Sequence, residues 1–170
     1  MQSRLIDDLK KILAKTSVLY TPEDLAVYGY DGTFIEARPD LVVLPETTEQ
    51  VSQIVQLAAK AHAPIVPRGM GSGLAAASVP FPAGGIVLCL TRMNHILEID
   101  LQNATVHVEA GVITADLQTA VEKIGLFYPP DPQYSSLDYR RQCCLQCRRT
   151  TLPQIWRNGR LRSGFDSRTG

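Results

Sequence analysis

The chain has 170 residues, of which 45% are hydrophobic and 20% charged, and its 17 basic and 17 acidic residues balance. This composition predicts a soluble globular protein of one domain, or of one domain followed by a tail. The sequence contains no apolar run of about 18 residues and no apolar centre of a secretory signal near its N-terminus, which excludes a transmembrane segment and favours a cytoplasmic location.

Two helices and two strands are predicted in the first third of the chain. Apolar residues recur at helical spacing from Ser3 to Ala14, which predicts a surface helix. Leu41 to Leu44 is an apolar run between two prolines and predicts a buried strand. Thr47 opens a capping box for a second helix that reaches Ala61, and Ile65-Val66 is the next strand. Together these segments predict a βαβ unit whose two strands pair in parallel.

A glycine-rich segment, PRGMGSGLAAASVP, follows that strand from Pro67 to Pro80. Glycines at alternate positions let backbone N–H groups approach one point, which favours an anion such as a phosphate or pyrophosphate. Arg68 is available for charge or for packing. A flexible connector is the alternative interpretation. The segment is neither a Walker loop, since no Gly-Lys-Ser/Thr follows, nor a Rossmann fingerprint, since its spacing differs.

The pattern then changes to a period of two. Gly85–Leu90, Ile96–Asp100 and Thr105–Glu109 are short and rich in β-branched residues, and we expect antiparallel strands there. A helix is predicted to begin at Thr114 and to be closed by Gly125. The segment LFYPPDP, residues 126–132, contains adjacent prolines and predicts a stiff turn that can form a rigid wall against a flat ligand.

Together these motifs resemble the FAD-linked oxidases of the vanillyl-alcohol oxidase fold, with a PCMH-type FAD-binding domain. Glycolate oxidase and D-lactate dehydrogenase flavoprotein subunits are the most similar members. The resemblance covers roughly Pro22 to Pro132. It implies an α+β fold in which a small parallel βαβ subdomain joins a mainly antiparallel sheet with helices, present here in incomplete form.

In that family the Pro-Arg-Gly-x-Gly-Ser/Thr-Gly loop wraps the FAD pyrophosphate, and the Tyr-Pro-Pro-Asp-Pro segment lies beside the cofactor. The matching cofactor-binding positions are Pro67, Arg68, Gly69, Met70, Gly71, Ser72, Gly73, Leu74, Ser78, Tyr128, Pro129, Pro130 and Asp131. Ser72 stands where covalent relatives have the flavin-linked histidine, so the resemblance implies non-covalent FAD. Ala76-Ala77 replaces a usual glycine pair, which requires an ordinary φ at both alanines.

The composition changes abruptly after the family-like part of the chain. Residues 1–132 carry nine Lys and Arg against 15 Asp and Glu, whereas residues 133–170 carry eight Arg and two Asp, with three of the four cysteines. The family has a Gly-Gly-Asn-Val-Ala loop here, and permitted codons for Arg140–Leu145 spell that string when they are shifted by one base. We therefore expect a helix in residues 1–20, the N-terminal part of an FAD-binding domain in 21–132, and an out-of-frame, disordered tail in 133–170.

Other interpretations of the tail have less support. Cys144 and Cys147 have Cys-x-x-Cys spacing, but no second ligand pair follows to complete a zinc site. The arginines lack the aromatic residues and the regular elements of a nucleic-acid platform. The resemblance implies that the intact protein oxidises a 2-hydroxy acid. It also allows the intact protein to assemble with other subunits of a complex and to lie at the periphery of the inner membrane. We expect this fragment to lack turnover. The alternative interpretations are a non-catalytic flavin- or nucleotide-binding module and an inert fragment.

Overall fold

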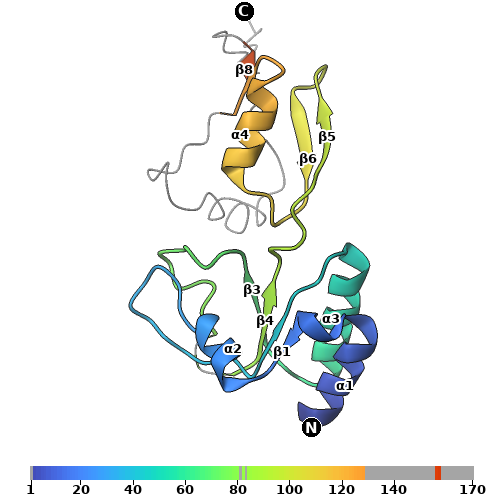
Figure 1. Ribbon diagram of the computed structural model, residues 1–170, viewed down its shortest axis with the longest axis vertical. Coiled ribbons are helices and arrows are strands. Elements are labelled where there is room, and N and C mark those ends of the chain that lie inside the picture. The colour runs from blue at the N-terminus through green and yellow to red at the C-terminus, as the bar shows by residue number, and fades with distance from the viewer. Residues whose placement is uncertain (1, 81, 83, 129–155, 158–170) are drawn as a thin grey trace, which may run out of the picture.

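The computed structural model describes residues 2–80, 82, 84–128 and 156–157. Figure 1 shows two parts, which we call the sheet part (residues 2–90) and the hairpin part (95–128). The sheet part contains α1 (Gln2–Ile12), the short 3-10 helix η1 (Lys15–Ser17), β1 (Val18–Leu19), α2 (Pro22–Val27), β2 (Leu41–Val43), α3 (Thr48–Lys60), β3 (Ile65–Arg68) and β4 (Ile86–Cys89). The hairpin part contains β5 (Ile96–Asp100), β6 (Thr105–Val108), α4 (Thr114–Glu122) and β7 (Leu126–Phe127), and β8 is Trp156–Arg157.

The four-stranded sheet has the order β1-β2-β4-β3, with β4 parallel to both of its neighbours and β1 antiparallel at one edge. The prediction of a direct β2–β3 pair is therefore wrong, because β4 lies between them. The prediction that Gly85–Leu90 belongs to the antiparallel group is also wrong. All four residues of β4 are buried, and a strand that is apolar on both faces suits the centre of a parallel sheet covered by helices.

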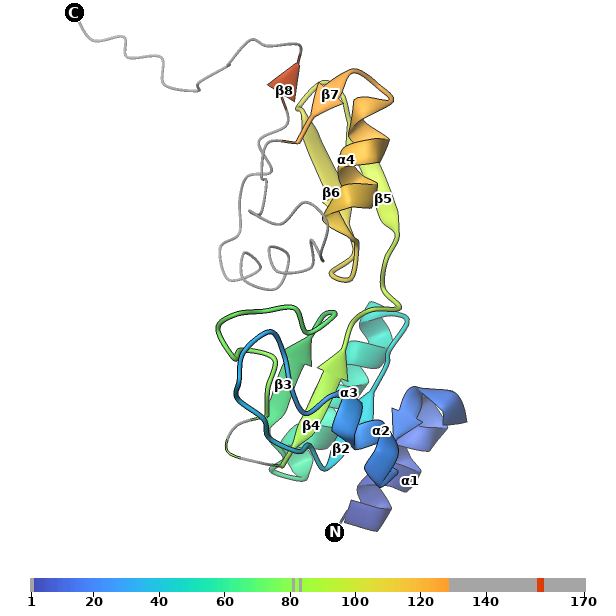
Figure 2. The ribbon, with the colours of Figure 1, turned by 60° about the vertical axis from the view of Figure 1, so that its left-hand side comes forward.

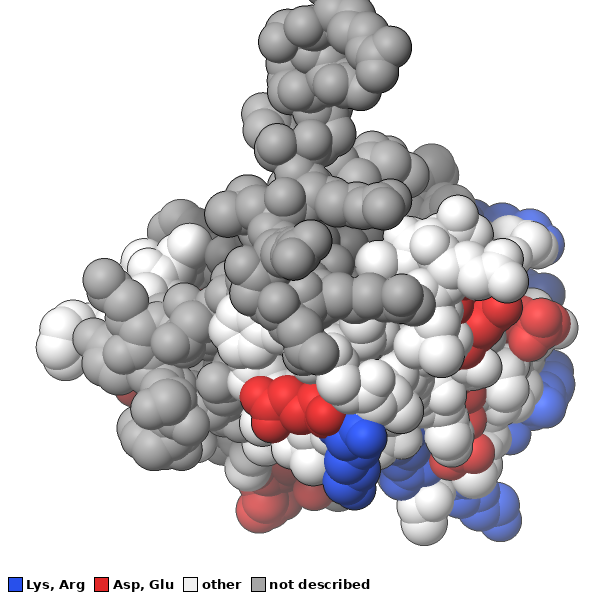
Figure 3. All heavy atoms as spheres, turned by 90° about the horizontal axis from the view of Figure 1, so that it is seen from above, with Lys and Arg blue, Asp and Glu red and all other residues white. Residues whose placement is uncertain are grey.

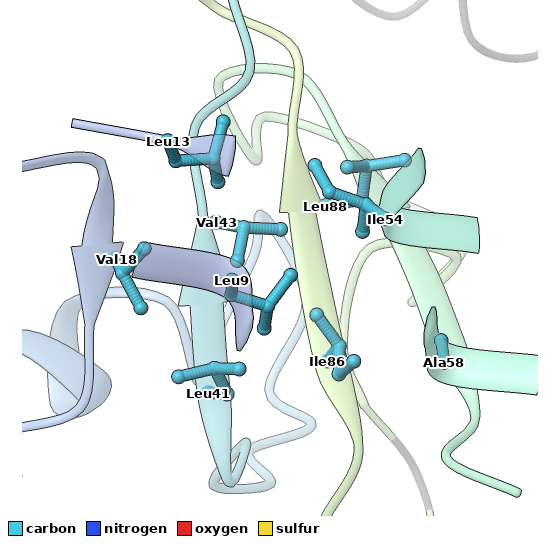
Figure 4. Packing of buried hydrophobic residues seen from close by; sticks show 9 residues of the cluster. All are labelled: Leu9, Leu13, Val18, Leu41, Val43, Ile54, Ala58, Ile86 and Leu88. Atoms are coloured by element: carbon cyan, nitrogen blue, oxygen red, sulfur yellow. The ribbon is translucent and has the colours of Figure 1, made fainter. Parts of the chain in front are cut away.

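Helices cover both faces of this sheet, and the alternation of side chains along β2 explains how. Leu41 and Val43 point to the α1 and α3 side, whereas Val42 points to the α2 side and packs with Leu25. Figure 4 shows the larger cluster, to which α1 contributes Leu9 and α3 contributes Ile54, both with no exposed surface. The N-cap predicted at Thr47 is confirmed, since its hydroxyl accepts a hydrogen bond from the Gln50 amide at 3.3 Å, whereas the Gln50 side chain accepts from the Glu46 amide at 2.7 Å and not from Thr47.

The hairpin part follows the predicted antiparallel arrangement. β5 pairs with β6, and the Asp100 carboxylate closes the turn by accepting hydrogen bonds from the amides of Gln102 and Asn103 at 2.8 and 3.0 Å. α4 packs its buried Leu117 and Val121 against these strands. Of the predicted tail, only the backbone of β8 is described, paired antiparallel with β7, and Cys144 and Cys147 lie outside the described residues.

The described surface has a mixed charge. Figure 3 shows acidic and basic side chains next to one another on the face that it displays, without a large area of one sign. None of the helices in the described part of the chain combines the length and the apolarity that crossing a bilayer requires.

Candidate functional site

The glycine-rich loop, residues 69–80, leaves the carboxyl end of β3. Parallel strands place their carboxyl ends at one edge of a sheet, and ligands of open α/β sheets bind at that edge. Figure 2 shows the loop in green next to the blue segment that follows α2, and a hydrogen bond from the Gly32 amide to the Gly73 carbonyl at 3.0 Å joins the two. The fold thus presents the predicted anion loop at the edge where a ligand is expected.

A cavity of about 500 Å³ lies at the opposite edge, where β2 and β4 begin. It is lined mainly by apolar residues, with Asp40 and His62 as its titratable groups. The Asp40 carboxylate already accepts a hydrogen bond from the Gly85 amide at 2.8 Å. This cavity therefore shares no residue with the predicted cofactor site.

Arg68 lies beneath the loop, with 5% of its surface exposed. Its Nη1 donates a hydrogen bond to the Tyr30 carbonyl at 2.6 Å, and its guanidinium lies 5.6 Å from the centre of the Tyr28 ring. Burial lowers the pKa of this guanidinium from its ordinary value, but an arginine remains charged in proteins. No carboxylate of the described residues forms an ion pair with it. Of the two roles left open for Arg68, these contacts support packing, with a buried positive charge below the loop.

Gly71 and Gly73 differ in whether the fold requires a glycine at their position. Gly71 has φ +78°, and a Cβ at this position would overlap the Arg68 guanidinium, so the protein itself demands a glycine there. A Cβ at Gly73 would meet nothing closer than the Asp31 Oδ2, at 3.7 Å, which is an ordinary contact. The fold therefore needs the first glycine, whereas the described residues leave room for a methyl group at the second.

The loop also offers backbone donors. Within the described residues, the amides of Gly69, Gly71 and Gly73 donate no hydrogen bond, although these residues are half-buried. Backbone N–H groups that have no protein acceptor remain available to water or to an anionic oxygen. The donors present, the space at Gly73 and the positive charge of Arg68 below fit the diphosphate of FAD.

Residues Tyr30–Thr33 also contact the loop, and no sequence prediction covered them. Asp31 is 7% exposed, and its Oδ1 accepts hydrogen bonds from the Thr33 amide at 2.8 Å and hydroxyl at 2.6 Å. Its Oδ2 accepts one from the Ser78 hydroxyl at 3.3 Å. The Asp-Gly-Thr pattern signals an Asx turn, but nothing local in it predicts a contact with residues 40 to 50 positions away.

The remaining predicted site residues fall into three groups. Ser72 is half-buried in the loop, while Met70 and Leu74 are 45% and 56% exposed. Tyr128 is buried with Val121 in the hairpin part. Pro129, Pro130 and Asp131 lie outside the described residues. The structure thus places positions 69–74 and 78 in one loop, Pro67 and Arg68 at the end of β3 that leads into it, and Tyr128 in a separate hydrophobic cluster.

Ala76 corrects one expectation. Its φ is +52°, in the left-handed region, whereas the sequence interpretation required an ordinary φ at both alanines, which holds only for Ala77. The left-handed conformation costs an alanine about 1–2 kcal/mol, and glycine removes this cost. Glycine also makes the unfolded chain more flexible, which cancels part of the gain in stability. Ala76→Gly is therefore expected to raise the free energy of unfolding by roughly 0.5–1 kcal/mol in urea denaturation.

Ala77→Gly is the matched control for that substitution. Since Ala77 has an ordinary φ, glycine there is expected to lower the free energy of unfolding by about 0.4–1 kcal/mol. Equal destabilisation by both substitutions would contradict the strain at Ala76.

Comparison with curated proteins finds relatives that are all much longer than this chain. Glycolate oxidase subunit GlcD of Bacillus subtilis is 48% identical over 107 residues, which are 62% of this chain and 23% of the relative. D-lactate dehydrogenase of Anaerostipes hadrus is 35% identical over 135 residues, covering 75% of this chain and 27% of the relative. D-2-hydroxyglutarate dehydrogenase of Stutzerimonas stutzeri is 38% identical over 128 residues. The chain spans about a quarter of the length of these relatives.

Solved structures share the fold. 4-Ethylphenol oxidase from Gulosibacter chungangensis is similar over 72% of this chain and 24% of its own, with a TM-score of 0.64 and 28% identity. Alkyldihydroxyacetonephosphate synthase is similar over 76% of this chain and 28% of its own, with a TM-score of 0.69 and 24% identity. The FAD binding domain family matches residues 39–137, more than half of the sequence. The chain therefore belongs to the FAD binding domain family, and the fold and cofactor implied by the sequence resemblance are confirmed.

Proposed function

We propose that this chain supplies the diphosphate-binding part of an FAD-dependent oxidoreductase that acts on a 2-hydroxy acid. The observation that carries the proposal is the loop itself, where the amides of Gly69, Gly71 and Gly73 have no acceptor among the described residues. Next to them, a Cβ at Gly73 would meet only the Asp31 Oδ2 among the described residues, at 3.7 Å, so a methyl group has room there. Donors and space at the ligand-binding edge of a parallel sheet suit the two phosphates of FAD.

Each loop residue has a distinct part in this proposal. The amides of Gly69, Gly71 and Gly73 hold the diphosphate, and Arg68 supports the loop from below while adding positive charge. Ser72 stands at the position of a covalent flavin link in some relatives, and a serine leaves the cofactor non-covalently bound. We also propose that Met70, Leu74 and Tyr128 to Asp131 line the cofactor. Bound FAD would supply the hydride acceptor, and these residues would position it.

The substrate class is proposed from the relatives. The names of three of them refer to glycolate, D-lactate and D-2-hydroxyglutarate, which are all 2-hydroxy acids. The name of the Bacillus subtilis relative includes the word subunit, which supports assembly of the full-length protein with other subunits. We also propose that this assembly lies in the cytoplasm or at the periphery of the inner membrane. Because this chain spans about a quarter of these proteins, we expect it to oxidise no 2-hydroxy acid alone and to retain FAD weakly.

A titration with ADP tests the site even if binding is weak, because ADP carries the diphosphate without the flavin. We expect ADP to shift the amide NMR signals of Gly69, Gly71 and Gly73 in the full 170-residue chain, and AMP to shift them less. Gly73→Ala fills the open space and is expected to weaken ADP binding at least tenfold while the signals of β2 and β4 stay in place. Absence of shifts in the loop at millimolar ADP would contradict the proposal.

We further propose that residues after about 132 are translated out of frame. We place the slip between Pro132 and Tyr139, and the end of the family match at residue 137 supports this position. The nucleotide sequence through codons 132 to 170 tests it. The expected result is Gly-Gly-Asn-Val-Ala codons one base out of register, and codons that cannot spell this string would contradict it.

A further inference from the structure

Three consecutive residues, Tyr30 to Gly32, each form a hydrogen bond with a different residue between Arg68 and Ser78. The Tyr30 carbonyl accepts from Arg68, the last residue of β3 before the loop, at 2.6 Å. The Gly32 amide donates to the Gly73 carbonyl in the middle, at 3.0 Å. The Asp31 carboxylate accepts from the Ser78 hydroxyl near the end, at 3.3 Å. This segment therefore spans the loop from end to end, although it precedes residues 39–137, which match the family.

The contact between the two segments is tight. A Cβ at Gly32 would lie 2.9 Å from the Gly73 carbonyl oxygen and 3.1 Å from that of Ser72, which no real side chain tolerates without moving the backbone. Glycine at position 32 thus permits the close approach of the two chains. The carbonyls of Ser72 and Gly73 face this segment, whereas the amides of Gly69, Gly71 and Gly73 have no acceptor among the described residues.

Asp31 is the side chain that anchors this segment. It is buried, and both of its carboxylate oxygens accept hydrogen bonds. A buried carboxylate next to a phosphate site repels the anion, so attraction cannot explain its place. Its hydrogen bonds from Thr33 and Ser78 instead orient the turn against the loop.

We propose that residues 30–33 form a positioning segment that holds the glycine-rich loop in its anion-binding conformation, with Asp31 as its positioning residue. The ligand-binding consequence rests on the proposed function, whereas the ordering of the loop does not. Removing the carboxylate releases Ser78 and Thr33, and the loop then samples conformations in which its amides no longer face one ligand.

Asp31→Ala is the first test, measured by NMR on the ligand-free 170-residue chain. We expect exchange of the hydrogen-bonded Gly32 amide to accelerate at least tenfold, and the ¹⁵N heteronuclear NOE of Gly71 and Gly73 to fall toward that of a mobile loop. The signals of β2 and β4 should stay in place. Unchanged exchange and an unchanged NOE would overturn the proposal, whatever the result with ADP.

Two further variants separate positioning from charge. Asp31→Asn removes the charge but keeps an oxygen for the Thr33 donors, so we expect a largely ordered loop and ADP binding equal to or tighter than that of the unmodified chain. Glu36→Ala removes the same charge from an exposed side chain of the same connection and is expected to change neither loop order nor ADP binding. If the loop is as disordered in the Asp31→Asn variant as in the Asp31→Ala variant, the hydrogen bonds from Thr33 do not position the loop, and that part of the proposal is overturned.

If Asp31→Ala does not fold, Thr33→Val provides the same test with a smaller change. It removes the hydroxyl donor at 2.6 Å and keeps the backbone donor. We expect a severalfold acceleration of Gly32 amide exchange, and no acceleration would overturn the proposal. If ADP fails to bind the unmodified chain, the proposed function fails, while the exchange measurements still test the positioning segment.

Discussion

Gly71→Ala is expected to lower the free energy of unfolding by about 2.5–5 kcal/mol, the sum of two effects. At φ +78° an alanine pays about 1–2 kcal/mol of backbone strain. The new Cβ also displaces the Arg68 guanidinium, which breaks a hydrogen bond from a charged group worth about 1.5–3 kcal/mol. Arg68 is buried and bonded to the Tyr30 carbonyl, so it cannot move aside freely.

Gly73→Ala is the matched control, since it adds the same methyl group two residues away. Its Cβ meets only an ordinary contact at 3.7 Å and its φ lies outside the left-handed region, so the free energy of unfolding should change by less than about 1 kcal/mol. Urea denaturation of both variants, followed by circular dichroism, measures the difference. Equal destabilisation by the two substitutions would contradict the distinct roles assigned to these glycines.

Arg68→Met is expected to destabilise the protein by about 2–4 kcal/mol, because it removes the charged, buried donor of the part-buried hydrogen bond to the Tyr30 carbonyl. Methionine keeps much of the apolar stem, so the loss reports mainly on the guanidinium. Arg68→Lys should restore only part of the stability, since a lysine cannot reproduce the planar donor geometry. Urea denaturation measures both variants.

Measuring ADP binding by the same variants distinguishes a supporting role of Arg68 from direct contact with the anion. If Arg68 acts from beneath the loop, stability and ADP affinity should fall together in Arg68→Met. Unchanged stability with lost ADP binding would show that its guanidinium contacts the ligand instead. Arg38→Met provides the control, since Arg38 is exposed and its removal should alter neither quantity.

Several features of the structure could be predicted from short stretches of the sequence. Helical periodicity predicted α1, the capping box at Thr47 predicted the start of α3, and alternation predicted the β5–β6 pair. The glycine spacing from Gly69 to Gly73 predicted the loop, and the combined motifs identified the family. These features depend on residues that lie a few positions apart, where backbone preference and local hydrogen bonds decide the conformation.

Other features depend on residues that meet only after folding. β4 follows β3 in the chain but inserts between β2 and β3, because its apolar side chains on both faces are best covered at the centre of the sheet. Ala76 adopts the left-handed conformation that its own preference disfavours. Arg68 turns beneath the loop toward Tyr30, and Asp31 reaches Ser78 across 47 positions of sequence. Contacts of this kind are set by long-range packing and by the need to pair buried polar groups, which no local pattern of residues encodes.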